Sequence, residues 1–264
     1  MEKHAITNTI TLNQKFLFLI FALLIISAEA KAQRDVSEAI STPYVGIHYG
    51  PNWTGGDLKD RYGFTNTIGT HTGYKTKRNW VYGIDANFTF GSDVKIEGII
   101  QNLKDEKGQI INTSGTPAIV LLMNRGFNVN ASVSKIIPIG KSNPNSGIMI
   151  QLTAGYVWHK LRIETQEDEV PQLQGDYLLG YDRLTTGFNT SQFIGYNFMA
   201  DRGILNFYAG AYFQQGFTVN QRDLFWDHPN EKVSKDLRME QMFGLRVGWL
   251  IPIYKRQVKD YYYN

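Results

Sequence analysis

Residues 80–91, WVYGIDANFTFG, alternate at almost every position between large apolar side chains and small or polar ones. One face of this segment carries Trp80, Tyr82, Ile84, Ala86, Phe88 and Phe90. The other face carries Val81, Gly83, Asp85, Asn87, Thr89 and Gly91. Because successive side chains of a β-strand point to opposite faces, this period of two predicts a strand with one apolar face.

The same alternation recurs along the rest of the chain. The further segments that show it are 43–53, 64–75, 126–134, 147–158, 188–199, 206–220 and 242–254. Their apolar faces are long and rich in aromatic residues, and their opposite faces combine Gly with Asn, Gln and Thr rather than with Lys or Glu. In a soluble sandwich the polar face would meet water, whereas in a membrane barrel the apolar face meets lipid and polar residues fill the interior. We therefore predict an all-β fold, an eight-stranded antiparallel up-and-down transmembrane β-barrel, with a β-sandwich as the alternative.

The segments between the expected strands alternate in length. The short ones are 76–79, 138–146 and 201–205, and the long ones are 54–63, 92–118, 165–187 and 221–238. Barrels of the outer membrane have short periplasmic turns and long external loops, and an even number of strands leaves both termini in the periplasm. This pattern predicts that the protein lies in the cell outer membrane with its long loops outside.

The first 32 residues have the features of a secretory signal. Lys3 and Lys15 precede an apolar run of 11 residues at 16–26, and the small-residue motif Ala30-Lys31-Ala32 follows it. The run is shorter than the roughly 20 residues that a spanning helix needs. We expect cleavage after Ala32, so that 1–32 is a signal peptide and 33–264 is one barrel domain.

Composition excludes several classes of function. The chain has 264 residues, no Cys and a formal net charge of +3, with a mean hydropathy of −0.29. The lack of Cys excludes disulfides, thiolate metal sites and a lipoprotein anchor, and the low mean hydropathy excludes a helical membrane bundle. The net charge is too small to indicate a nucleic-acid partner, and the His residues lack close metal-ligand spacing. We expect no metal and no cofactor.

Strand periodicity places a small set of charged and polar residues inside the barrel. The four that matter most are His48, His71, Asp85 and Arg246. His71 and Asp85 face each other if the turn between their strands centres on Arg78. Asp85 is expected to be the only inward acid, so it should lie near Arg246 across the lumen. A buried polar network is one interpretation, and base catalysis by His71 with Asp85 is the alternative.

The long loop 165–187 carries more apolar residues than a solvated loop needs. In 165–187 the candidate residues for partner binding are Leu173, Asp176, Tyr177, Tyr181 and Asp182. Such residues either pack over the barrel mouth or form a surface for a protein partner. The loop 92–118 is expected to extend the barrel wall as two strands joined by a turn near 105–108. The charged loop 221–238 is expected to be a solvated face.

These features together resemble a known group of proteins. The chain resembles the small eight-stranded outer-membrane barrels of the OmpA and OmpX architecture over residues 43–255. The sequence Ala-Lys-Ala before Gln33 and the strands rich in Gly and aromatic residues are similar to those of PorT-type barrel proteins of Bacteroidota. Residues 244–254, GLRVGWLIPIY, are similar to the aromatic-ended closing strand that barrel-assembly machinery reads, although here a tail follows Tyr254. Such families include assembly factors for type IX secretion, adhesins and envelope-integrity proteins.

The expected function is therefore that of a non-enzymatic outer-membrane barrel, a structural or accessory component in contact with membrane lipid. Its external loops would bind a protein partner within a secretion or envelope-assembly complex. Two alternatives stay open at this point, a small-solute pore and a lipid-modifying barrel enzyme. Eight strands leave an interior that side chains largely fill, which argues against a wide pore.

Overall fold

The computed structural model describes residues 39–140, 143–166, 169–200 and 205–253. The expected signal peptide 1–32, the acidic pair Glu167–Asp168 and the tail 254–264 lie outside the described residues. The strands are β1 (Thr42–Gly56), β2 (Thr65–Lys75), β3 (Trp80–Gly91), β4 (Leu121–Pro138), β5 (Gly147–Glu164), β6 (Thr185–Met199), β7 (Asn206–Asn220) and β8 (Arg238–Pro252). Short 3-10 helices lie at η1 (Asp57–Asp60), η2 (Gln101–Leu103), η3 (Pro171–Leu173) and η4 (Gly175–Gly180).

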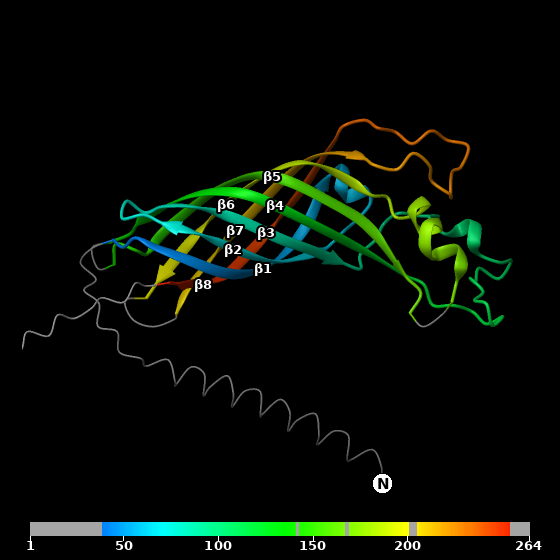
Figure 1. Ribbon diagram of the computed structural model, residues 1–264, viewed down its shortest axis with the longest axis horizontal. Coiled ribbons are helices and arrows are strands. Elements are labelled where there is room, and N and C mark those ends of the chain that lie inside the picture. Colours follow the sequence, from blue (N-terminus) through cyan, green and yellow to red (C-terminus); the bar gives the residue numbers. More distant parts are fainter. Residues whose placement is uncertain (1–38, 141–142, 167–168, 201–204, 254–264) are drawn as a thin grey trace, which may run out of the picture.

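The eight strands form one closed barrel in chain order (Figure 1). Each strand pairs antiparallel with the next, and β1 closes the barrel against β8 with Trp53 opposite Phe243. The prediction of an eight-stranded antiparallel barrel is confirmed. Closure leaves no strand edge unpaired within the barrel wall, which is the condition for placing a sheet in lipid.

Burial alternates along the strands as the sequence pattern predicts. On β3, Ile84 is 54% exposed, while its neighbour Asp85 is 1% exposed. The exposed set is apolar and aromatic, and the buried set is mainly polar. The barrel is thus apolar outside and polar inside, the reverse of a soluble β-sandwich.

The two ends of the barrel differ (Figure 1). The strand ends that the short connections join (β2 to β3, β4 to β5 and β6 to β7) lie at one end, and the described parts of the long loops, with the 3-10 helices, lie at the other. In the turn 76–79, Asn79 adopts a φ of 60°, and the amide of Thr76 donates to the carbonyl of Trp80. This tight turn sets the register that places His71 opposite Asp85.

The prediction of two strands in 92–118 is wrong. Within this segment the structure has η2 and two isolated bridges, Tyr62 to Val94 and Ile111 to Pro117. Gly98, Gly108 and Gly115 have positive φ values, which interrupt extended backbone. Ile99 and Ile100 are both buried although they are adjacent, so the segment does not follow the alternation of a strand.

The interior of the barrel is layered along its axis. Buried polar side chains such as Lys75, Asn145 and Asn197 form hydrogen bonds at the short turns. The next layer is an apolar cluster of Tyr44, Val81, Ile136, Met149, Phe193, Tyr208, Tyr212 and Leu250. Polar and charged side chains fill the middle. A second apolar cluster closes the end that carries the long loops, and its members are Leu58, Tyr62, Ile99, Ile100, Ile110, Leu161, Ile163, Val170, Leu173, Tyr181 and Met242. We call the long-loop end the cap.

Candidate functional site

The charged centre of the lumen unites three of the four residues predicted there. His71 on β2 lies opposite Asp85 on β3, with 3.8 Å between Nε2 and Oδ2. Arg246 on β8 reaches across the barrel, with Nη1 3.7 Å from Oδ1 of Asp85. Its guanidinium also lies over the ring of Tyr212, 3.8 Å from the centroid. The predicted proximity of Asp85 and Arg246 is a direct ion pair.

A chain of amides extends from this centre. Gln151 Nε2 donates to Asp85 Oδ2 over 3.2 Å. The fourth predicted residue, His48, contacts Asn87 instead, with 2.5 Å between Nε2 and Oδ1. Asn87 in turn donates to Asn128 over 2.7 Å. Buried polar groups are expected to pair in this way, because each unpaired group has a desolvation cost.

The arrangement around His71 differs from a catalytic triad. Ser132 Oγ lies 3.2 Å from His71 Nε2, the same nitrogen that faces Asp85. In a Ser-His-Asp triad the serine and the carboxylate occupy opposite ring nitrogens. His71 is also fully buried, and it lines neither of the two cavities described below. The geometry is that of a filled polar core.

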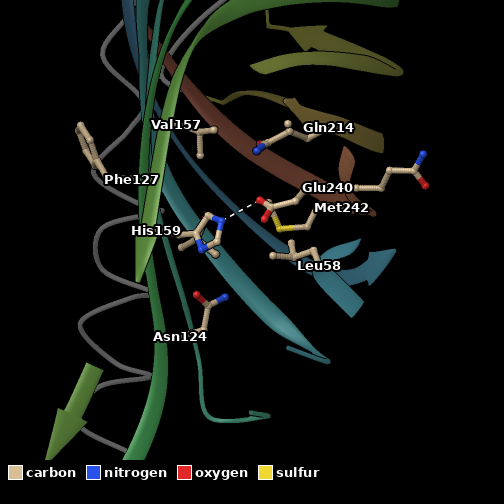
Figure 2. A pocket seen from close by; sticks show the side chains of 12 residues that line it. Leu58, Asn124, Phe127, Val157, His159, Gln214, Glu240 and Met242 are labelled. Carbon is tan, nitrogen blue, oxygen red and sulfur yellow. Dashed lines mark hydrogen bonds and ion pairs between the residues drawn. The ribbon is translucent and has the colours of Figure 1, made fainter. Parts of the chain in front are cut away.

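A second ionic cluster lies closer to the cap. Glu240 on β8 is buried and forms ion pairs with Arg61 and with His159, whose Nε2 lies 2.7 Å from Glu240 Oε2. Figure 2 shows His159 and Glu240 reaching toward each other, with Leu58 and Met242 beside them. The adjoining cavity has a volume of about 30 Å³, which has space for about two water molecules at most.

Glu240 corrects the expectation that Asp85 is the only inward acid. The expected strand 242–254 begins four residues after the start of β8 at Arg238, so Glu240 fell between it and the expected loop 221–238. Glu240 shares its parity with Met242, Gly244 and Arg246, and all face the lumen side of β8. Extending the alternation of residues 242–254 by one period toward the N-terminus identifies Glu240 as an inward residue.

The cap is a packed structure rather than a set of solvated loops. Leu173 and Tyr181 are buried in the apolar cluster of the cap. Asp182 is also buried, and its carboxylate accepts hydrogen bonds from Arg222 Nε at 2.8 Å and Nη2 at 2.6 Å. The hydrogen bond to Asp182 raises the pKa of Arg222. Most of the loop 221–238 is exposed, as expected for a solvated face, and its Arg222 attaches it to the loop 165–184.

Of the five residues predicted to bind a partner, two are accessible. Asp176 and Tyr177 lie on η4 and are exposed, Tyr177 to 63%. Leu173, Tyr181 and Asp182 are covered by the cap itself, because the loops pack on one another over the barrel mouth. Partner binding by this loop stays a prediction, and it now concerns η4.

A larger pocket opens on the cap, and the sequence interpretation missed it. Its volume is about 380 Å³. The residues that line it are Asp60, Arg61, Lys95, Ile96, Glu97, Arg183, Asn220, Phe225 and Arg238. These residues come from four segments far apart in the chain, so no local motif announces the pocket. Four cationic and two acidic side chains are among these lining residues.

Other site classes find no support in the described part of the chain. Within residues 39–140, 143–166, 169–200 and 205–253, no group of His, Asp and Glu gathers as metal ligands would. Among the same residues, no helix is long and apolar enough to cross a membrane.

Comparison with known proteins gives similarity of architecture. No family model matches the chain, and no curated protein matches it in sequence. Among solved structures it is similar to Ail, the attachment invasion locus protein of Yersinia pestis, crystallised with the heparin analogue sucrose octasulfate, at 10% identity and a TM-score of 0.41 over 80% of this chain and 99% of that chain. Neisserial surface protein A matches at 8% identity and a TM-score of 0.39 over 80% and 98% of the two chains. The N-terminal barrel domain of OprF from Pseudomonas aeruginosa matches at 12% identity and a TM-score of 0.39 over 80% and 100%. At these identities and TM-scores the similarity assigns no activity.

Proposed function

We propose that this protein is a non-enzymatic β-barrel of the outer membrane that acts through its external cap, as an accessory component that binds a partner at the cell surface. The observation that carries the proposal is the combination of an apolar outer wall with a filled interior. The wall accounts for the location, and the interior argues against transport. Because the wall meets lipid and the interior is filled, the cap is the part of the molecule that can bind a partner.

The outer wall supports the membrane location. Large apolar side chains such as Ile47, Ile194 and Leu245 are more than half exposed. Aromatic residues mark both ends of the wall, with Tyr74 and Trp80 near the short turns and Trp53 and Phe243 near the cap. A soluble monomer rarely exposes so large an apolar area, whereas a lipid-facing belt with aromatic girdles requires it.

The filled interior supports a structural role over a pore. Two apolar clusters occupy the lumen, and ion pairs lie between the clusters. Tyr208, Phe193 and Leu161 are among the largest fully buried side chains. A solute would have to displace these packed groups, and eight strands leave no room for them to move aside.

The cap offers a surface for a protein partner. Tyr177 and Leu179 on η4 are exposed, and Trp226 lies beside them, since its indole N–H donates to the carbonyl of Tyr177. Aromatic residues are enriched at protein interfaces. The proposed context is a secretion or envelope-assembly complex, as the resemblance to PorT-type barrels implies.

The test uses the absence of Cys from the sequence. Single variants Tyr177→Cys on the cap and Lys77→Cys in a short turn are labelled with a bulky, membrane-impermeant maleimide. In intact cells we expect labelling of Tyr177→Cys alone, and after lysis we expect labelling of both. Labelling of only Lys77→Cys in intact cells would reverse the orientation and refute an external cap.

Partner binding has its own test. A photo-crosslinking amino acid at position 177 should yield a discrete adduct in intact cells, identified by mass spectrometry. The same amino acid at the lipid-facing position 84 serves as the control. If the two positions give the same protein adducts, the cap has no specific partner.

A further inference from the structure

The basic pocket on the cap lies outside the strands' lipid-facing wall. Arg61 follows η1, Lys95 belongs to the loop after β3, Arg183 precedes β6, and Arg238 begins β8. Packing of three separate long loops around the end of β8 brings the four cations together. Like charges repel, so a fold that gathers them needs compensation from acids or from a bound anion.

Buried acids pair with two of the four cations, Arg61 and Arg183. Arg61 is paired with Glu240, and its Nη1 donates to Thr185 Oγ1 at 3.0 Å. Arg238 Nη1 donates to Asn220 Oδ1 at 3.2 Å, which is a neutral acceptor. Lys95 is exposed at the pocket edge.

Arg183 is the most informative of the four. It is 8% exposed, and its Nη2 pairs with Asp227. Its Nη1 is buried without a hydrogen-bond partner among the described residues. Burial lowers the pKa of Arg183, although Asp227 raises it. A buried guanidinium N–H without an acceptor is costly, and this one is enclosed by protein atoms, so a ligand in the pocket would reach it only after the side chain turns.

Two acids also line the pocket, and their position matters. Asp60 and Glu97 are exposed, whereas Arg61 and Arg183 lie deeper. Solvent screens exposed carboxylates more than it screens buried guanidinium groups. The inner arginines Arg61 and Arg183 are paired with Glu240 and Asp227, so Arg238 and Lys95 are the cations that a ligand can pair with.

We propose that this pocket binds a small ligand that carries a phosphate group. Arginine forks match the geometry of phosphate oxygens and can donate two parallel hydrogen bonds, and Lys95 adds a mobile charge. The guanidinium carbon of Arg183 lies over the ring of Phe225, 3.5 Å from its centroid. The volume lies in the range of small-molecule sites, so the ligand is larger than the bare ion, and Phe225 and Ile96 supply apolar contact for its carbon skeleton.

The inference rests on the proposed external position of the cap for access to the ligand, but its test does not. The full-length mature protein is purified in a maltoside detergent, which carries no phosphate. It is titrated calorimetrically with inorganic phosphate, glucose 6-phosphate, glucose 6-sulfate and glucose, at constant ionic strength. We expect saturable binding of glucose 6-phosphate, weaker binding of inorganic phosphate and none of glucose. Glucose 6-sulfate that binds more tightly than the phosphate ester would overturn the choice of phosphate.

Variants locate the binding. Arg238→Gln and Lys95→Gln should each weaken binding of glucose 6-phosphate about tenfold, the effect of losing one charged hydrogen bond. Arg183→Lys keeps the charge but loses the fork, and it should weaken binding as well. Lys232→Gln removes an exposed cation of the cap outside the pocket and is the matched control. Circular dichroism and heat-dependent gel migration verify that each variant is folded.

The outcomes separate the sources of phosphate and the two proposals. Binding of lipopolysaccharide, but not of glucose 6-phosphate, with the same dependence on Arg238 would identify the phosphate as a lipid headgroup. Absence of saturable binding by every phosphate probe, or equal weakening by Lys232→Gln and Arg238→Gln, would refute the pocket. The maleimide test of orientation does not depend on these results. The proposal that the cap is external can therefore be refuted or supported separately from the proposal of a ligand pocket.

Discussion

At the scale of single residues, the charged side chains buried in the lumen have one another as neutralising partners. Asp85 and Arg246 lie 3.7 Å apart and are both almost fully buried. A charge turned to the lipid midplane would cost about 2–4 kcal/mol, so the inward placement of Arg246 is strongly preferred. Inside the barrel, the same charge requires a carboxylate.

A double-mutant cycle tests this pair. Asp85→Asn and Arg246→Gln should each lower the free energy of unfolding, by about 3–5 kcal/mol, because each leaves an uncompensated buried charge. The double variant should lose less than the sum of the two, since it strands no charge. Urea unfolding of the protein in detergent, followed by tryptophan fluorescence, measures all four states. Additive losses would show that the two residues do not interact.

Lumenal glycines provide the space for aromatic side chains. An added Cβ at Gly248 would lie 2.4 Å from Tyr208 Cε1, whereas at Gly216 the nearest atom, Thr218 Cγ2, would be 3.4 Å away. Gly248→Ala should therefore destabilise the barrel by about 1–3 kcal/mol through overpacking. Gly216→Ala, on the neighbouring strand and the same face, should change the unfolding midpoint little. Equal midpoints for the two variants would contradict the packing of Tyr208 over Gly248.

At the scale of elements, the strands and the cap obey different rules. Strands follow the period of two, because alternate side chains meet lipid and lumen. The cap loops instead bury adjacent residues such as Ile99 and Ile100 in an irregular core. This difference explains why the strands were predicted correctly and 92–118 was not.

A substitution that destabilises the cap should accordingly leave the stability of the barrel unchanged. Leu173→Ala removes a buried side chain of the cap, at a local cost of about 2–5 kcal/mol. We expect faster proteolysis within 165–184 and an unchanged melting temperature of the barrel, because the strand hydrogen bonds do not pass through the cap. Leu179→Ala, at an exposed position of η4, is the matched control and should change neither. A parallel drop in the barrel's melting temperature would show instead that cap and barrel unfold together.

At the scale of the whole molecule, successive layers of side chains close the barrel along its axis. They are held by different interactions: apolar packing in two clusters, ion pairs between the clusters, and hydrogen bonds of buried polar residues at the short turns. Loosening the cap therefore leaves the other layers in place.

This closure predicts a lack of steady conductance. Purified protein in planar lipid bilayers should give a current at the level of bare lipid, and so should the Leu173→Ala variant. A porin incorporated under the same conditions verifies that the bilayer reports channels. Reproducible unit openings of the wild-type protein would favour the small-solute pore over the proposed accessory role.

The sequence by itself determined the strands, their faces and the alternation of short turns and long loops. It also determined the pairing of His71 with Asp85, because a tight turn fixes the register of a hairpin. These features depend on the contrast between lipid and lumen at successive residues and on short connections, and both can be read locally.

Only the tertiary structure decided which residues meet across the barrel and within the cap. The contact of Arg246 with Asp85 forms only when β8 closes on β1. The alternation of side chains along the strands had indicated that both residues face the lumen. Glu240 and the basic pocket of Arg61, Arg183 and Arg238 were not foreseen, because loops without periodicity bring distant charges together. Side chains in such loops pack according to the shape of the surrounding core, and that shape exists only after the barrel has closed.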